Sequence, residues 1–145
     1  MSQTIKWNPG SITSLLTTEL NSLSSGSLSA LGAEFDNTSG LYLFADFQLD
    51  VTFGSAPTAN TPLVLYLVPK TDGTNYNFGG SSAAWDGFVR GGWQMMAITT
   101  QQLLTIQGIA IPPLKFKIQI KNQTNQPLPS SGSTVKMVPY NYLAA

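Results

Sequence analysis

Residues 41–53 read LYLFADFQLDVTF, and this stretch decides the fold expected for the whole chain. Every second residue is apolar, whereas the interleaved positions become polar from Asp46 onward. Successive side chains of a β-strand point to opposite faces, so the pattern predicts a strand with one face in a core and the other in water. A helix would instead place Asp46 and Asp50, one turn apart, among core residues. The expected core side chains are Leu41, Leu43, Ala45, Phe47, Leu49, Val51 and Phe53.

A strand that is buried on one face needs a second layer to cover it, and the rest of the chain supplies further strands. Apolar runs between turn residues predict strands at about residues 12–17, 28–35, 63–69, 93–99, 103–111, 114–121 and 134–142, with a helical turn at about 18–22. Strands and helices do not alternate. The sequence therefore predicts an all-β fold, a two-layer antiparallel β-sandwich of the jelly-roll kind. Pro139 interrupts the last run, so the C-terminal part of that strand is expected at a sheet edge.

The domain organisation expected from the sequence is simple. Residues 1–11 should form an extended N-terminal arm, and residues 12–145 a single sandwich domain, because the chain is long enough for one core. The arm carries Trp7 just before Pro9, within a turn signal. Trp7 either packs on its own domain or inserts into a neighbouring subunit, where tryptophan often dominates binding.

The composition is poor in charge and lacks two reactive residue types. Lysine plus arginine and aspartate plus glutamate number 7 each, and only 10% of residues are charged, against about 25% in ordinary soluble domains. Such a chain lacks the clustered cations of nucleic-acid binders. It also has little electrostatic repulsion between copies, which favours a role as one component of an assembly. The absence of cysteine and histidine excludes disulfide scaffolds, Cys/His zinc sites, histidine-based triads and thiol nucleophiles. No apolar run approaches the roughly 18 residues of a membrane span, and the N-terminus lacks the apolar core of an export signal.

Carboxylates remain as acid–base candidates, but their spacing argues against catalysis. Asp46 and Asp50 lie two pleats, about 13 Å, apart on one strand face, whereas glycosidase pairs need about 5–9.5 Å. A solvated sheet face explains them better. A lysine row on the strand at 114–121 would oppose these aspartates if that strand paired with residues 41–53, each exposed pair adding under about 1 kcal/mol. The row consists of Lys115, Lys117 and Lys121.

Metal and cofactor sites are not predicted. The stretches 72–77 and 36–37 offer oxygen ligands without the carboxylate density of a calcium loop. No phosphate loop or dinucleotide glycine fingerprint is present. Two triplets that resemble glycosylation sites, at Asn37 and Asn122, are interpreted as turn residues.

The long irregular stretch at residues 70–92 is rich in glycine yet carries aromatic side chains, so it is expected to be ordered. These side chains either hold the stretch against the sandwich, stack on sugar rings, or contact another subunit. Together with the arm they give the candidate partner-binding residues, which are Trp7, Pro9, Tyr76, Phe78, Trp85 and Phe88.

Several stretches resemble a family of small proteins that are encoded among the structural genes of tailed bacteriophages. They are ELNSL at Glu19–Leu23, FADFQLDVTFGSAPTA at Phe44–Ala59, LYLVPKTDGTNY at Leu65–Tyr76, PPLKFK at Pro112–Lys117 and VPYN from Val138. The resemblance covers most of residues 15–142. It departs at 77–92, where this chain has its own insert containing glycine and tryptophan.

The resemblance implies a non-enzymatic virion protein of the capsid decoration (cement) type, made in the host cytoplasm and located on the capsid surface. Its implied partners are the major capsid protein and copies of itself, with a trimer favoured, and host glycans are a further class. Neither nucleic acid nor a membrane is expected, and the family brings no catalytic motif or cofactor. The alternatives are a carbohydrate-binding module on the virion surface or tail, and another tail or head-completion protein.

Overall fold

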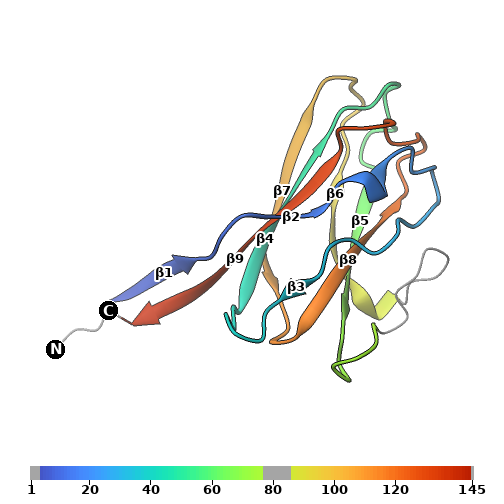
Figure 1. Cartoon of the computed structure of the whole chain (residues 1–145). Coiled ribbons are helices and arrows are strands. Elements are labelled where there is room, and N and C mark those ends of the chain that lie inside the picture. Colours follow the sequence, from blue (N-terminus) through green and yellow to red (C-terminus); the bar gives the residue numbers. More distant parts are fainter. Residues whose placement is uncertain (1–3, 77–85, 145) are drawn as a thin grey trace.

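The computed structural model describes residues 4–76 and 86–144, and most of the regular structure in them is β-strand (Figure 1). Two single-turn 3-10 helices, η1 (Thr18–Leu20) and η2 (Asp86–Phe88), lie in connections. No helix in this part of the chain is long and apolar enough to cross a membrane. The strands are β1 Ile5–Pro9, β2 Thr13–Leu16, β3 Phe35–Asp36, β4 Phe44–Val51, β5 Pro62–Pro69, β6 Val89–Gln94, β7 Gln102–Ala110, β8 Lys115–Asn122 and β9 Thr134–Ala144.

Strands β2 to β9 form the two-layer antiparallel sandwich that the sequence predicts (Figure 1). One sheet has the order β2-β9-β4-β7, with β1 joining β9 beyond the end of β2, and the other has the order β3-β8-β5-β6. Pairing links β2 with β9, β3 with β8, β4 with β7, and β5 with β6. Within the sandwich, counted from β2 to β9, the first strand thus pairs with the last, the second with the second-last, and so on inward. A long hairpin rolled into two sheets in this way is a jelly roll, so the predicted fold class is confirmed.

The core lies between the two sheets, and β4 shows how the sequence pattern creates it. Burial alternates residue by residue along this strand, and Phe47 and Leu49 are 0% exposed, as predicted. They pack in one cluster with side chains of the facing sheet, including Ile118 and Ile120 of β8. The indole N–H of Trp93 on β6 donates to the Phe47 carbonyl on β4 at 3.3 Å, so a buried hydrogen bond also joins the layers.

The apolar alternation starts earlier in the sequence than β4 does in the structure. Leu41 and Leu43, predicted in the core, are each 54% exposed, and that part of the prediction is wrong. The cause is a loop held by Asn37, whose Oδ1 accepts the N–H of Tyr42 and whose Nδ2 donates to the carbonyls of Tyr42 and Pro112 at 2.8–2.9 Å. Leu41 has a φ of 46°, a left-handed conformation outside the strand region.

The strand predicted at residues 28–35 is mostly irregular. Only a single bridge to β8 and the two residues of β3 pair as strand. Between them the chain contacts both sheets in turn, because the N–H of Gly32 donates to the Ile118 carbonyl of β8 and the N–H of Ala33 donates to the Leu15 carbonyl of β2. A segment that hydrogen-bonds to both sheets in turn belongs to neither, and hydrophobic period does not reveal such a crossing.

The strand predicted at residues 93–99 begins and ends earlier in the structure, as β6. Its middle contains Gly91 and Gly92, which pair with β5 but carry no side chain that would create a hydrophobic period. The hydrophobic pattern therefore does not reveal that β6 begins within the glycine-rich stretch.

The lysine row lies on β8, which pairs with β3 and β5 in the sheet that faces β4. The lysines therefore do not oppose Asp46 and Asp50, and the conditional pairing is wrong. Lys115 instead lies 3.7 Å from a carboxylate oxygen of Glu34 and 3.6 Å from one of Asp36.

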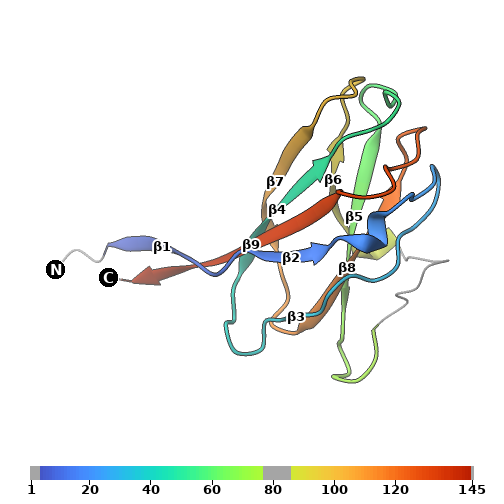
Figure 2. The same ribbon diagram turned by 45° about the horizontal axis from the view of Figure 1, so that its top comes forward.

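Within the predicted arm, residues 5–9 form strand β1, paired antiparallel with β9 from Ile5↔Ala144 to Pro9↔Tyr140. Residues 4–9 and 140–144 make a two-stranded element, here called the ribbon, that extends away from the sandwich in both views (Figures 1 and 2). Beyond Tyr140, β9 has β1 as its single strand partner among the described residues, so one edge is free, as Pro139 predicts.

Candidate binding surface at the root of the ribbon

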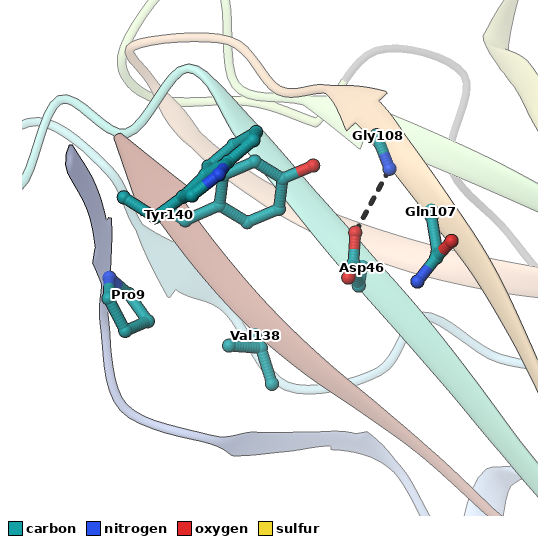
Figure 3. Close-up of a pocket in the computed structure, with 7 residues that line it drawn as sticks. Pro9, Asp46, Gln107, Gly108, Val138 and Tyr140 are labelled. Carbon is teal, nitrogen blue, oxygen red and sulfur yellow. Dashed lines mark hydrogen bonds between the residues drawn. The ribbon is translucent and has the colours of Figure 1, made fainter. Parts of the chain in front are cut away.

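A β-bulge on the outer face of the five-stranded sheet positions the polar part of the candidate site. The register of β4 and β7 shifts next to Asp46, so Gln107 and Gly108 of β7 both face this one residue of β4. Gly108 has a φ of 70°, a left-handed conformation that suits glycine at a bulge. Its N–H donates to Asp46 Oδ1 at 2.9 Å (Figure 3). The bulge thus fixes a carboxylate on the outer face of the sheet.

Four aromatic rings lie on the same face, beside this carboxylate. Trp7 of β1 lies opposite Tyr142 of β9 with ring centroids 4.5 Å apart, and it meets Tyr140 edge-on at 5.0 Å. Phe44 of β4 stacks against Tyr140 at 5.9 Å. Tyr140 and Tyr142 are two residues apart, so strand alternation brings both rings to one side of the ribbon.

Two adjoining hollows run over this face and share Asp46 and Val138; together they are here called the groove. The smaller hollow, of about 290 Å³, continues along the strands and is also lined by Ile12, Gln48, Thr105 and Lys136. The larger hollow has a volume of about 480 Å³, within the roughly 300–1,000 Å³ of small-ligand pockets. Its lining residues, drawn in Figure 3, are Trp7, Pro9, Asp46, Gln107, Gly108, Val138 and Tyr140.

Asp46 and Tyr140 set the electrostatics of the groove. Burial raises the pKa of the Tyr140 hydroxyl, and the nearby negative charge of Asp46 raises that pKa further. Tyr140 therefore stays protonated at neutral pH. A carboxylate offers about four acceptor positions, so Asp46 keeps acceptor capacity after receiving the Gly108 N–H.

This arrangement suits binding better than reaction. One carboxylate, Asp46, lines the groove, whereas acid–base cleavage of glycosides uses two. Within residues 4–76 and 86–144, no group of three or more potential metal-ligating side chains gathers in one place.

The structure separates the partner-binding residues predicted from the sequence. Trp7 and Pro9 line the groove, and Trp7 is 63% exposed. Phe88 is 7% exposed and packs with Tyr66 and Val68 on the outer side of the other sheet. In this position its ring offers little surface to a partner. Two further candidates lie outside the described residues, namely Phe78 and Trp85.

Tyr76 is engaged by charged neighbours of its own domain. The ammonium groups of Lys70 and Lys117 each lie 4.8 Å from the centre of its ring, and its hydroxyl donates to Glu34. For Tyr76 and Phe88, these contacts favour the interpretation that aromatic side chains hold residues 70–92 against the sandwich.

Sequence reasoning missed Gln107, Gly108 and Tyr140, and it interpreted Asp46 as part of a solvated face. The sequence does contain a partial signal: Tyr140 and Tyr142 alternate as residues on one face of a strand do, and Trp7 is an aromatic residue near the other end of the chain. Nothing in the sequence indicates that these two segments pair, so it does not predict that the three rings lie together.

No family model matches the chain, and no curated protein does. Among solved structures, the chain is similar to a chain of turnip yellow mosaic virus, with 17% identity, a TM-score of 0.36, and coverage of 100% of this chain and 82% of that chain. A chain of Israeli acute paralysis virus matches with 12% identity and a TM-score of 0.38, over 99% of this chain and 74% of that one.

A mitogen from Yersinia pseudotuberculosis also matches, with 11% identity, a TM-score of 0.27, and coverage of 97% of this chain and 86% of that chain. These similarities carry no argument about function.

Proposed function

We propose that this chain is a non-enzymatic structural protein of a bacteriophage particle, a decoration (cement) protein on the outer surface of a shell built by a major capsid protein. The low charge of the chain and the stretches that resemble structural proteins of tailed phages support this proposal. The ribbon supports it most directly, because it is an element built to reach beyond its own domain.

The ribbon exposes apolar side chains where it is farthest from the sandwich. Ile5 is 72% exposed, Leu143 is 52% exposed and Tyr142 is 46% exposed; these three residues are here called the tip. An isolated two-stranded ribbon is only marginally stable in water, and here apolar side chains are exposed on both of its faces, Ile5 and Tyr142 on one and Leu143 on the other. A partner that covered the tip would add the packing that the ribbon lacks.

Neighbouring residues extend this apolar surface. Leu41 and Leu43 are each 54% exposed, and the N–H of Leu43 donates to Asn141 of the ribbon at 2.8 Å. Stable interfaces bury about 1,600 Å² in total, and an extended ribbon reaches such an area more readily than the face of a small domain. Copies of the chain are the second proposed partner, with a trimer favoured, because assembly around a symmetry axis multiplies the contact.

The test is the occupancy of assembled particles. Shells are incubated with the full-length protein or with an Ile5→Ser/Leu143→Ser variant, purified, and analysed by quantitative mass spectrometry and electron microscopy. We expect shell-scale copy numbers for the unaltered protein and a strong loss for the tip variant. The same strong loss is expected when residues 1–9 are deleted.

Leu103→Ser is the matched control, because Leu103 is 55% exposed on β7 but lies outside the ribbon, and its occupancy should not change. Normal occupancy of the tip variant would reject docking through the ribbon. A handful of copies per particle would instead indicate a tail or head-completion protein.

A further inference from the structure

We infer that the groove at the root of the ribbon binds a neutral oligosaccharide. In this arrangement one sugar ring packs against Trp7 and Tyr140, and its hydroxyl groups hydrogen-bond with Asp46 and Gln107. This activity goes beyond the proposed shell attachment, which uses the tip.

The aromatic wall is the first reason. Trp7 remains 63% exposed although its ring contacts both Tyr140 and Tyr142, so its indole has a large uncovered area beside the larger hollow. Leaving such a ring in water is unfavourable, and tryptophan and tyrosine provide rigid surfaces with a polar edge. The C–H face of a pyranose is flat and weakly polar, and it matches a surface of this kind.

The polar groups beside the wall are the second reason. Asp46 is held by the Gly108 N–H, and it keeps free acceptor capacity. Gln107 lines the same hollow from the bulge and is exposed, and its amide can both donate and accept. Sugar hydroxyls also donate and accept, so neighbouring hydroxyls of one ring can pair with a carboxylate and an amide together.

The charge of the larger hollow selects against other ligand classes, because Asp46 is the one charged side chain among the described residues that line it, whereas Lys136 lines the smaller hollow. A phosphate or another anion at the larger hollow would meet the negative charge of Asp46. A fully apolar peptide would bury Asp46 with only the Gly108 N–H as its hydrogen-bond donor and leave its other acceptor positions unsatisfied, which is unfavourable. A divalent cation would find one carboxylate lining the groove, where calcium sites use several. A neutral, hydroxyl-rich ligand satisfies Asp46 and covers Trp7.

The smaller hollow indicates that the ligand is longer than one ring. It shares Asp46 and Val138 with the larger hollow and adds Gln48, Thr105 and Lys136, three further hydrogen-bonding side chains. A second sugar unit would extend along β4 and β9 into this space. We therefore expect oligosaccharides to bind more tightly than the corresponding monosaccharides.

The test uses the fluorescently labelled full-length protein on an array of neutral oligosaccharides, followed by calorimetry with the best array ligand. We expect selective binding, a loss of at least about tenfold in affinity for Gln107→Ala and for Asp46→Asn, and a larger loss for Trp7→Ala. Gln107 is exposed, so its variant keeps the fold even if Asp46→Asn disturbs the bulge. The matched control is Asp50→Asn, on the same face of β4 but outside both hollows, and it should bind like the unaltered protein.

Three outcomes would overturn the inference. They are no binding by the unaltered protein on the array, unchanged affinity of both Gln107→Ala and Trp7→Ala, and an equal loss for Asp50→Asn and Asp46→Asn. A groove variant that binds sugars normally but fails to occupy particles would show that the groove contacts the shell instead.

The two proposals fail separately. The Ile5→Ser/Leu143→Ser variant should bind sugar normally while its occupancy falls, whereas Gln107→Ala should occupy particles normally while sugar binding falls. Loss of both functions in Gln107→Ala would refute the separation of tip and groove.

Discussion

Two leucines on neighbouring strands of one sheet serve this molecule differently. Leu49 of β4 is 0% exposed between the sheets, whereas Leu103 of β7 is 55% exposed on the outer face. The burial of Leu49 follows directly from its place in the alternation of residues 41–53. Alternation fails for Leu41, because a loop anchored by a buried asparagine overrides the period locally.

We predict that Leu49→Ala lowers the free energy of unfolding by about 2–5 kcal/mol, since it removes buried contacts and leaves a cavity. Leu103→Ala should change it by no more than about 0.5 kcal/mol. Urea unfolding followed by tryptophan fluorescence measures both values. Equal losses for the two variants would contradict the assignment of the core.

Asp72 allows a prediction about pH at the same scale. Its carboxylate accepts the N–H groups of Asn75 at 2.6 Å and Thr74 at 2.8 Å, and these bonds lower its pKa to about 2. Because the folded-state pKa is depressed, the turn is stabilised above the ordinary value of 3.8, and this support is lost as pH falls through about 2.

In an NMR titration, we therefore expect the amide signals of Thr74 and Asn75 to shift with a midpoint near pH 2. The Asp72→Asn variant should show no such transition. A midpoint near 3.8 in the unaltered protein would mean that the two hydrogen bonds do not form in solution.

Among the elements, two loops depend on buried asparagines at their bases. Asn37 and Asn122 are both 0% exposed, and their amides hydrogen-bond to backbone carbonyls of distant segments, such as Pro112 and Leu23. The sequence marks both positions as turn residues. It does not reveal their burial, because the carbonyls that they pair with come from other parts of the chain.

Replacing Asn37 with alanine should lower the free energy of unfolding by about 1–3 kcal/mol, because the carbonyls of Tyr42 and Pro112 lose their donor. Asn37→Asp should destabilise as well, since an ionised carboxylate cannot donate. Thermal unfolding measures the change, with the exposed Asn21→Ala as control. Unchanged stability of both Asn37 variants would refute this role of the side chain.

At the scale of the whole molecule, the sandwich and the ribbon differ in how they are supported. The sandwich strands have partners within a sheet and a facing layer, whereas the ribbon, as far as residues 4–76 and 86–144 show, has one pairing and no second layer (Figure 2). The jelly-roll class could be predicted from strand count and spacing. The partnership of residues 5–9 with 140–144 could not, because pairing between distant segments leaves no local pattern.

We predict that backbone amides of β1 and of residues 140–144 exchange with deuterium much faster than those of β4 and β8, because a two-stranded ribbon opens at little cost. Hydrogen exchange with mass spectrometry measures this in the isolated protein. Attachment to a shell should slow exchange in the ribbon selectively. Equal protection of ribbon and sandwich in the isolated protein would contradict this division.

The central place of β9, between β2 and β4, has a consequence for biosynthesis. While a ribosome is still making residues 134–144, β9 does not yet exist. One edge of β4 then lacks its hydrogen-bonding partner, and β2 has no strand to pair with. Until β9 forms, the core lacks Val135 and Met137 of that strand, and Phe47 and Leu49 are incompletely covered. Slow synthesis would prolong this stage, and a chaperone that binds incomplete β-sheets would raise the yield of folded protein.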